Sequence, residues 1–259
     1  MKTRTRLRHA AADSLTMVER SLRHMVRDVD SLLLGVILPV VLLLMFVYVF
    51  GGAIDPGTGY LDYVVPGIIL VCAGYGAAST SVAVATDLAE GIVDRFRSMP
   101  ILSSAMLTGH VVASTVRNVV SMVIVIGVAL LMGFRPTAGP LEWLGAAGVL
   151  VLFMLAVSAL AAVFGLVAKT PESAGAFPFF VLFLPYASSA FVPTDTMPGW
   201  LRWFAENQPV TPVIETVRAL LVGGGPAGGD AVPAVAWFGG LLVLAQTLAV
   251  VLFRRRTAR

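Results

Sequence analysis

The residues best suited to interact chemically with a partner form a polar interruption between two long apolar stretches, residues 87–100. Charges of both signs at close spacing suit docking into a complementary groove, where they set register more than affinity. Phe96 and Met99 would supply an apolar anchor, and Pro100 would end the helix and redirect the chain. A simpler interpretation is an interfacial helix that only links two spans. The charged residues are Asp87, Glu90, Asp94, Arg95 and Arg97.

The sequence does not indicate catalysis within this chain. It has no G-x-x-x-x-G-K-[ST] phosphate-binding loop, and the glycine cluster at 223–229 has no lysine and no preceding strand. It also has no HExxH, GxSxG or paired Cys/His pattern. The single cysteine, Cys72, lies in an apolar run and can form no disulfide within the chain. We therefore expect no active site and no cofactor or metal bound by this chain.

The composition is that of a membrane protein. The chain has 259 residues, of which 58% are hydrophobic and 13% charged, whereas a soluble domain has about half and about a quarter. A spanning helix needs about 20 mostly apolar residues. We expect one all-α transmembrane domain over residues 1–259, with six helices. These are predicted at 31–53, 63–86, 107–133, 143–168, 173–192 and 231–253.

The first apolar run is longer than the ~7–15 residues of a signal-peptide core, so we interpret it as a retained helix. Among the six spans, only the third contains Asp, Glu, Lys, Arg or His; these residues are His110 and Arg117, and we expect Arg117 to extend toward the interface. Proton- and ion-driven transporters usually place carboxylates or histidines at membrane depth. Their scarcity here indicates that any uphill transport draws its energy from a source outside these spans.

The distribution of Lys and Arg predicts the orientation, because cytoplasmic loops are enriched in these residues. Fourteen of the 18 fall in the segments on the N-terminal side of the membrane, three on the opposite side and one, Arg117, within a span. Both termini are therefore predicted to be cytoplasmic, together with residues 87–100.

An amphipathic helix is expected over residues 13–29, before the first span. Apolar residues recur there at spacings of three and four, as on one face of a helix. Such a helix lies in the membrane interface. It could be a passive anchor or could also touch a cytoplasmic partner. Its basic residues are Arg20, Arg23 and Arg27.

The outer segment 193–222 is too apolar for a plain loop and predicts two short helices that re-enter the outer leaflet. Pro198 suits the start of the first. For the second we expect Pro212 at its first position, Thr211 as its cap and Glu215 near its N-terminus. The alternative is an interfacial cover without cargo contact. Further residues of this expected hairpin are Trp200, Trp203, Pro209 and Arg218.

These features together resemble the ABC-2 type permeases, the membrane subunits of ATP-binding-cassette exporters, and among them the daunorubicin-resistance-like drug exporters. The first feature that carries the resemblance is the loop from Leu88 to Ile101. It contains Glu90, Gly91, an acidic residue, a basic and apolar stretch and Pro100. The second is the outer run Met-Pro-Gly-Trp-Leu-Arg at 197–202 with Asn-Gln-Pro-Val-Thr-Pro at 207–212. The third is the N-terminal amphipathic helix.

The resemblance implies a pair of permease chains, identical or different, with two ATPase subunits that bind ATP and Mg²⁺, in a bacterial cytoplasmic membrane. Residues 13–29 and 88–100 would contact the ATPase, and span five with the re-entrant helices would frame the exit. The residues implied in coupling are Glu90, Gly91, Asp94, Arg95, Phe96, Arg97, Pro100, Arg20, Arg23 and Arg27. Candidate residues of a cargo path are Tyr75, Ser79, Phe180, Phe183, Tyr186, Trp200 and Trp203.

The expected cargo is a hydrophobic drug or a similar amphiphile, because apolar walls without buried charge suit such molecules. A lipid, glycolipid or polysaccharide is an alternative cargo, since aromatic side chains could line a sugar path. A non-transporting membrane scaffold is a different class of function. A secondary transporter is disfavoured by the lack of intramembrane carboxylates.

Overall fold

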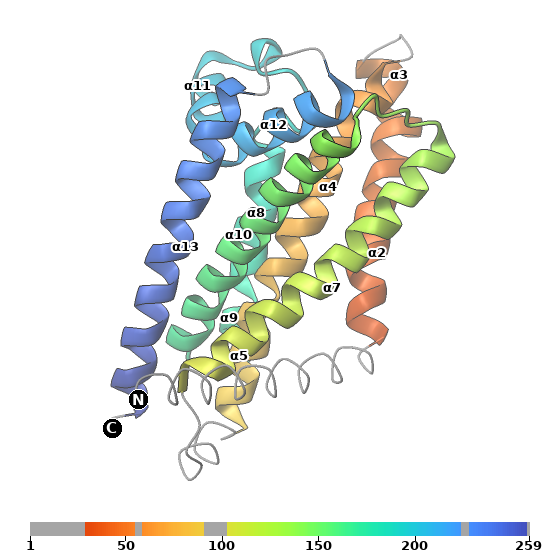
Figure 1. Cartoon of the computed structure of the whole chain (residues 1–259). Coiled ribbons are helices and arrows are strands. Elements are labelled where there is room, and N and C mark those ends of the chain that lie inside the picture. Colours follow the sequence, from red (N-terminus) through yellow and green to blue (C-terminus); the bar gives the residue numbers. More distant parts are fainter. Residues whose placement is uncertain (1–28, 55–58, 91–102, 224–227, 258–259) are drawn as a thin grey trace.

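The computed structural model describes residues 29–54, 59–90, 103–223 and 228–257. Throughout these ranges the regular structure is helical, and no strand occurs in them. Residues 13–28 of the expected interfacial helix and residues 91–100 of the polar loop lie outside the described part of the chain. Figure 1 shows long helices side by side, with α11 and α12 at the upper end and α9 at the lower end.

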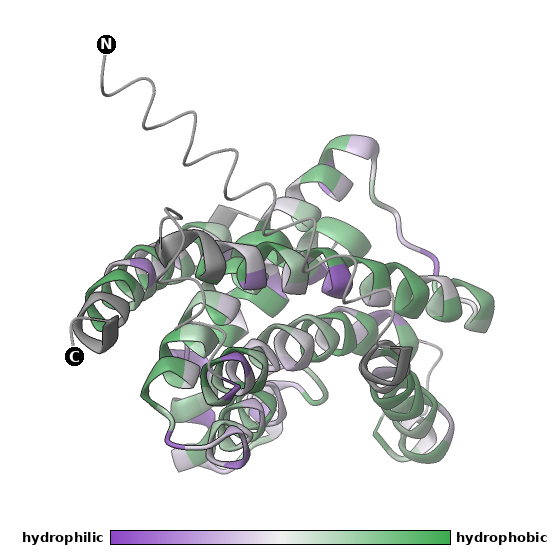
Figure 2. Ribbon diagram, turned by 90° about the horizontal axis from the view of Figure 1, so that it is seen from below, coloured by the Kyte–Doolittle hydropathy of each residue, from purple (hydrophilic) through white to green (hydrophobic). Residues whose placement is uncertain are grey.

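Five helical stretches in the described ranges are long and apolar enough to cross a membrane. The first is continuous through α2 (Val29–Leu44), a π-helical turn η1 (Met45–Phe50) and α3 (Gly51–Ile54). The second joins α4 (Tyr60–Ala78) to α5 (Thr80–Ala89). The others are α7 (Ser103–Met132), α8 (Pro140–Val167) and α13 (Gly228–Thr257). Hydrophobic residues cover most of these helices (Figure 2).

The region expected as a helix over 173–192 differs from that expectation. It forms α9 (Pro171–Ala174) and α10 (Ala176–Tyr186), separated at Gly175. Pro185 supplies no backbone N–H in the last turn of α10, and the chain leaves the helical path at Ala187. The 11 residues of α10 rise only about 16 Å at 1.5 Å per residue, about half of a hydrocarbon core of ~30 Å.

The outer segment forms a short 3₁₀ turn, η2 (Thr194–Thr196), and two helices, α11 (Gly199–Asn207) and α12 (Val210–Val222). Pro198 immediately precedes α11, as expected. The expected start of the second helix was wrong, because α12 begins at Val210 with Pro209 before it. Thr211 is consequently inside the helix and its hydroxyl donates to the Ala205 carbonyl instead of capping α12.

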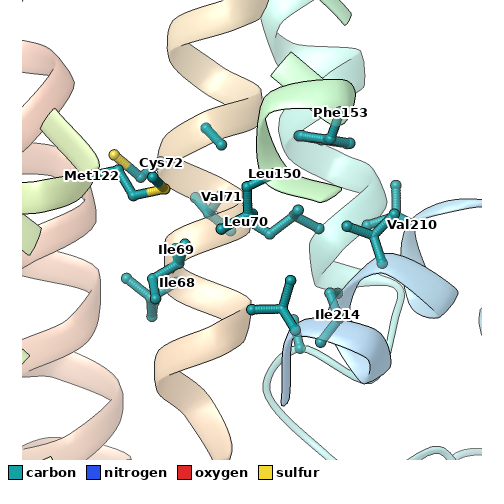
Figure 3. Close-up of a cluster of buried hydrophobic side chains, with 14 of the residues drawn as sticks. Ile68, Ile69, Leu70, Val71, Cys72, Met122, Leu150, Phe153, Val210 and Ile214 are labelled. Carbon is teal, nitrogen blue, oxygen red and sulfur yellow. The ribbon is translucent and has the colours of Figure 1, made fainter. Parts of the chain in front are cut away.

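Helix α4 is the centre of the core, because every residue from Val64 to Gly74 is buried. It packs against α2, α7, α8, α10 and α12. Figure 3 shows Ile68 to Cys72 of α4 among side chains from three other helices: Met122, Leu150, Phe153, Val210 and Ile214. The second span therefore touches most of the other helices, so a displacement of α4 must be accommodated throughout the bundle.

Candidate functional site

The lower end of the bundle in Figure 1, which we call the inner end because the sequence predicts it to face the cytoplasm, holds the two helices on either side of the polar loop; the opposite end is called the outer end. Helix α5 ends at Ala89, with Glu90 exposed just beyond it, and α7 begins at Ser103. The remaining expected coupling residues lie outside the described residues: Gly91, Asp94, Arg95, Phe96, Arg97, Pro100, Arg20, Arg23 and Arg27. In this region the structure describes α5 and α7, the two helices that connect the loop to the rest of the bundle. Any displacement of the loop must therefore pass through them.

Asp87 and His110 join these two helices. His110 Nε2 lies 3.0 Å from Asp87 Oδ2, a hydrogen-bonding distance across 23 residues of sequence. The side chains retain only 21% (Asp87) and 16% (His110) of their surface. Hydrogen bonds that involve a charged group are shorter and stronger than those between neutral groups. The contact therefore fixes the last turns of α5 against the first turns of α7.

Arg117 makes a second connection between the same two spans. Its Nη2 donates to Ser79 Oγ over 2.9 Å, whereas the sequence suggested that this side chain would extend toward the interface. Ser79 is the residue between α4 and α5, and its hydroxyl donates to the Gly76 carbonyl within the span. Arg117 therefore contacts span two at the residue that separates α4 from α5.

Buried polar residues continue this arrangement toward the centre of the bundle. Asn118 is 2% exposed, and a Cβ added to Gly76 would lie 1.8 Å from Asn118 Oδ1, so any larger residue at position 76 would require the Asn118 side chain to move. Ser114 Oγ donates to the Gly76 carbonyl over 3.3 Å. Ser158 Oγ of α8 lies 3.3 Å from Ser114 Oγ. Polar groups therefore join spans two, three and four at this level of the bundle.

The residues expected to line a cargo path lie in separate places. Tyr75 and Ser79 are half-buried within span two. Phe180, Phe183 and Tyr186 are exposed along α10 by 78%, 63% and 40%. Because α10 has no charged residue, it presents an aromatic and entirely apolar surface outward.

The aromatic surface of α10 joins a stack of rings at its outer end. Tyr186 stacks on Phe191 with ring centroids 5.0 Å apart. Phe191 stacks in turn on Phe46 of the π-helical turn at 4.1 Å. Offset-stacked rings are favourable beyond their burial alone. The stack therefore ties span one to the end of α10. The sequence did not identify Phe46 or Phe191, and an isolated phenylalanine in an apolar run gives no signal for this role.

Trp200 and Trp203 lie on α11 and are exposed by 76% and 68%. On the same helix Arg202 Nε donates to Glu206 Oε1 over 2.7 Å, and this hydrogen bond raises the pKa of Arg202. A helix with exposed indoles and a charged pair suits the boundary between membrane and water.

Arg218 of α12 connects three segments at the outer end. Its guanidinium donates to the Tyr63 carbonyl at 3.2 Å, to the Ser189 carbonyl at 2.7 Å and to Glu215, three residues earlier. It also lies over the Tyr63 ring, 3.9 Å from the centroid. Tyr63 in turn donates its hydroxyl to the Ser189 carbonyl at 2.8 Å. Arg218 and Glu215 are therefore brought together, and with Tyr63 they hold α12 on α4.

Gln208 fixes the end of α10 from the same side. Its Nε2 donates to the Leu184 carbonyl at 3.0 Å and to the Ala187 carbonyl at 2.9 Å. The last carbonyls of a helix have no partner within the helix, so the amide replaces the missing backbone donors. In the sequence, Gln208 stood out only as part of the Asn-Gln-Pro-Val-Thr-Pro motif, although a glutamine between two short helices is a usable signal.

No group of three or more His, Cys, Asp or Glu side chains in the described ranges is placed to hold a metal ion. The arrangement consists instead of helix-to-helix polar contacts at the inner end, an aromatic surface on α10 and a braced pair of short helices at the outer end.

Comparison with known proteins agrees with this geometry. Residues 13–222 match the family model of the ABC-2 type transporters. The chain is 35% identical over 190 residues to the daunorubicin resistance ABC transporter permease protein DrrB1 of Streptomyces coeruleorubidus, a match that covers 73% of this chain and 67% of that protein. It is 23% identical over 247 residues to the probable doxorubicin resistance ABC transporter permease protein DrrC of Mycobacterium tuberculosis (strain CDC 1551 / Oshkosh), covering 94% and 89%.

The chain therefore belongs to the ABC-2 type transporter family. It is a multi-pass membrane permease, a transport subunit without an ATPase domain that works with an ABC ATPase subunit. The family resemblance drawn from the loop at 88–101 and the outer motifs is thereby confirmed.

Proposed function

We propose that this permease exports hydrophobic drugs or similar amphiphiles across a bacterial cytoplasmic membrane, driven by ATP hydrolysis in its partner subunits. The observation that carries the proposal is the aromatic surface of α10. Phe179, Phe180, Phe183 and Tyr186 are all exposed, and α10 contains no charge. An apolar, ring-bearing cargo can stack on such a surface, and each aromatic pair contributes about 0.5–1.5 kcal/mol beyond area burial. The resistance names of the relatives support the same cargo class.

We further propose six membrane crossings with both termini in the cytoplasm. Helix α9 lies at the lower end of the bundle and α12 at the upper end (Figure 1), which supports a crossing by the chain between them. In this topology α10 and the turn at 187–192 together make the fifth crossing. The outer helices α11 and α12 would then cover its exit. Non-helical backbone at membrane depth is tolerated where protein covers it, and Gln208 and Arg218 supply such cover for the turn.

The proposed assembly contains two permease chains and two ATPase subunits, with ATP and Mg²⁺ bound by the ATPases. Residues 13–29 and 88–100 of each permease would contact an ATPase. Charges of both signs around Glu90 suit a complementary groove. Closure of the ATPases would displace the loop and, through α5 and α7, the core around α4.

The cargo assignment is tested with the permease and its ATPase reconstituted together in inside-out vesicles. ATP-dependent uptake of daunorubicin is measured beside uptake of a headgroup-labelled phospholipid. A variant of the ATPase that lacks its phosphate-loop lysine is the control for both. We expect daunorubicin uptake that requires the intact ATPase, and reduced uptake for Phe180→Ala with Phe183→Ala.

The other functions give different results in the same vesicles. Uptake of the lipid but not of the drug would assign the chain to lipid export and contradict the proposed cargo. Uptake of a labelled oligosaccharide would assign it to polysaccharide or glycolipid export. No ATP-dependent uptake of any of them, from a complex that hydrolyses ATP, would favour a scaffold.

A further inference from the structure

We propose that two polar contacts, Asp87–His110 and Ser79–Arg117, clamp α5 to α7 so that both helices follow the polar loop as one body. We call these four residues the inner clamp. The inference rests on the proposed function, because it takes the loop at 88–100 to be the point where the ATPase acts. It adds to that function the residues that carry the displacement into the membrane, of which Asp87 begins the polar interruption and the other three lie outside it.

The first argument is the position of the contacts relative to the loop. Helix α5 leads into the loop and α7 leads out of it. Asp87 lies within three residues of the end of α5, and His110 lies about two turns after the start of α7. A force on the loop could otherwise separate the two helices or slide one along the other. The 3.0 Å contact between these side chains opposes both motions.

The second argument is the register. Eight positions separate Ser79 from Asp87 and seven separate His110 from Arg117, each close to two turns of about 3.6 residues. The two contacts therefore lie on the same facing surfaces of the antiparallel pair. One contact alone is a pivot, whereas two contacts on one seam fix both the angle and the register of the helices.

The third argument is the continuation of the seam into the core. Beyond Arg117, the buried Asn118 packs on Gly76, and Ser114 bonds to the Gly76 carbonyl. Ser158 brings in α8 through Ser114. Apolar side chains between helices can slide over one another with little directional preference, but hydrogen bonds between helices are directional and satisfy groups that lipid cannot. A displacement of α5 and α7 therefore reaches α8 without a change in the register between these helices.

Two threonines provide matched controls. Thr86 Oγ1 donates to the Val82 carbonyl within α5, and Thr115 Oγ1 donates to the Val111 carbonyl within α7. Each lies within two residues of a clamp residue but bonds to its own helix. Valine at either position removes a polar group of the same region without cutting a contact between helices.

The first test measures daunorubicin moved per ATP hydrolysed by the complete complex in vesicles. We expect D87A, H110A and R117M to lower this ratio by about two- to thirtyfold, the range that mutations along a coupling network produce, while the complex continues to hydrolyse ATP. The exchanged pair D87H/H110D should recover most of the ratio. T86V and T115V should leave it unchanged. An unchanged ratio in the clamp variants, or an equal fall in the threonine variants, would overturn the proposal.

A second test needs no cargo. Spin labels are placed at Leu131 on α7 and Val243 on α13, both exposed, in a background with Cys72→Ala. We expect an ATP-dependent change in their separation for the wild-type complex and T86V, and loss of that change for D87A. A change equal in all three would overturn the clamp while leaving the proposed function intact. No change in the wild-type complex would contradict the proposed function and the clamp with it.

Discussion

The Arg218 guanidinium reaches the Ser189 carbonyl over 2.7 Å, and the Tyr63 hydroxyl reaches the same oxygen over 2.8 Å. One carbonyl of the turn after α10 therefore receives a donor from α12 and another from α4. The turn, the second span and the outer helix are held at a single point. This arrangement explains why a segment without regular helix can lie beside apolar spans, because its backbone acceptors are satisfied by side chains.

Replacing Arg218 with methionine should destabilise the outer end strongly. The change removes the donor to the Tyr63 and Ser189 carbonyls and the ion-pair partner of Glu215. By analogy with buried charged contacts, we expect the free energy of unfolding to fall by about 2–4 kcal/mol. Thermal unfolding of the purified permease in detergent measures it. The control is Arg202→Gln, whose ion pair is about half exposed, and exposed ion pairs of this kind contribute little to stability. Equal unfolding temperatures for the two variants would refute the role assigned to Arg218.

Gly76→Ala should destabilise the contact between spans two and three. The added Cβ would lie 1.8 Å from Asn118 Oδ1, and overpacking of this kind costs about 1–3 kcal/mol. The double variant G76A/N118A should regain most of the loss, because the shorter side chain leaves room. Gly127→Ala on α7 meets nothing within 4 Å and serves as the control. If G76A unfolds at the wild-type temperature, the packing described for the inner half is wrong.

Gln208→Leu should loosen the end of α10. The amide donates to two carbonyls, and removal of one partner of a buried group costs about 1–3 kcal/mol. Hydrogen exchange at residues 183–190 should rise in this variant, and its unfolding temperature should fall. Asn207→Ala removes an exposed amide that bonds within α11 and should change neither quantity. Unaltered exchange in Gln208→Leu would show that another group caps α10.

Phe180→Ala with Phe183→Ala should change transport more than stability. Both rings are mostly exposed, whereas Phe153 is 1% exposed and its truncation should cost about 3–5 kcal/mol. We therefore expect the α10 variant to unfold near the wild-type temperature but to show a raised KM for daunorubicin. Phe153→Ala should unfold early, which separates the two effects. A wild-type KM in the α10 variant would remove this surface from the cargo path.

The sequence predicted the long spans well because their signal is local. An uncharged run such as the one that became α8 contains in itself the length and hydropathy that define a spanning helix. The shortened α10 was not predicted, because Gly175 and Pro185 lie within a continuous apolar run. The carbonyls at the end of α10 are bonded by the amide of Gln208, a residue more than 20 positions away.

The polar contacts were also beyond the sequence, for the same reason. His110 and Arg117 were recognised as the ionisable residues of the third span, but their partners Asp87 and Ser79 are defined by how two antiparallel helices pack. Arg218 was predicted only as a residue of the outer hairpin, and the backbone carbonyls that accept its hydrogen bonds carry no sequence signature. Helix positions follow from composition, whereas contacts between helices follow from register.

The central claim is that energy enters through the polar loop from a separate ATPase. Its most direct measurement is daunorubicin uptake into inside-out vesicles that contain the permease and its ATPase, for wild type and for Glu90→Arg with Asp94→Arg. Each is assayed once with ATP and once with a proton gradient alone. We expect ATP-dependent uptake by the wild type, little or none by the charge-reversed protein when it is equally folded, and none under the gradient alone. Undiminished ATP-dependent uptake by the charge-reversed protein, or uptake driven by the gradient without ATPase, would contradict the proposed route of energy through the loop.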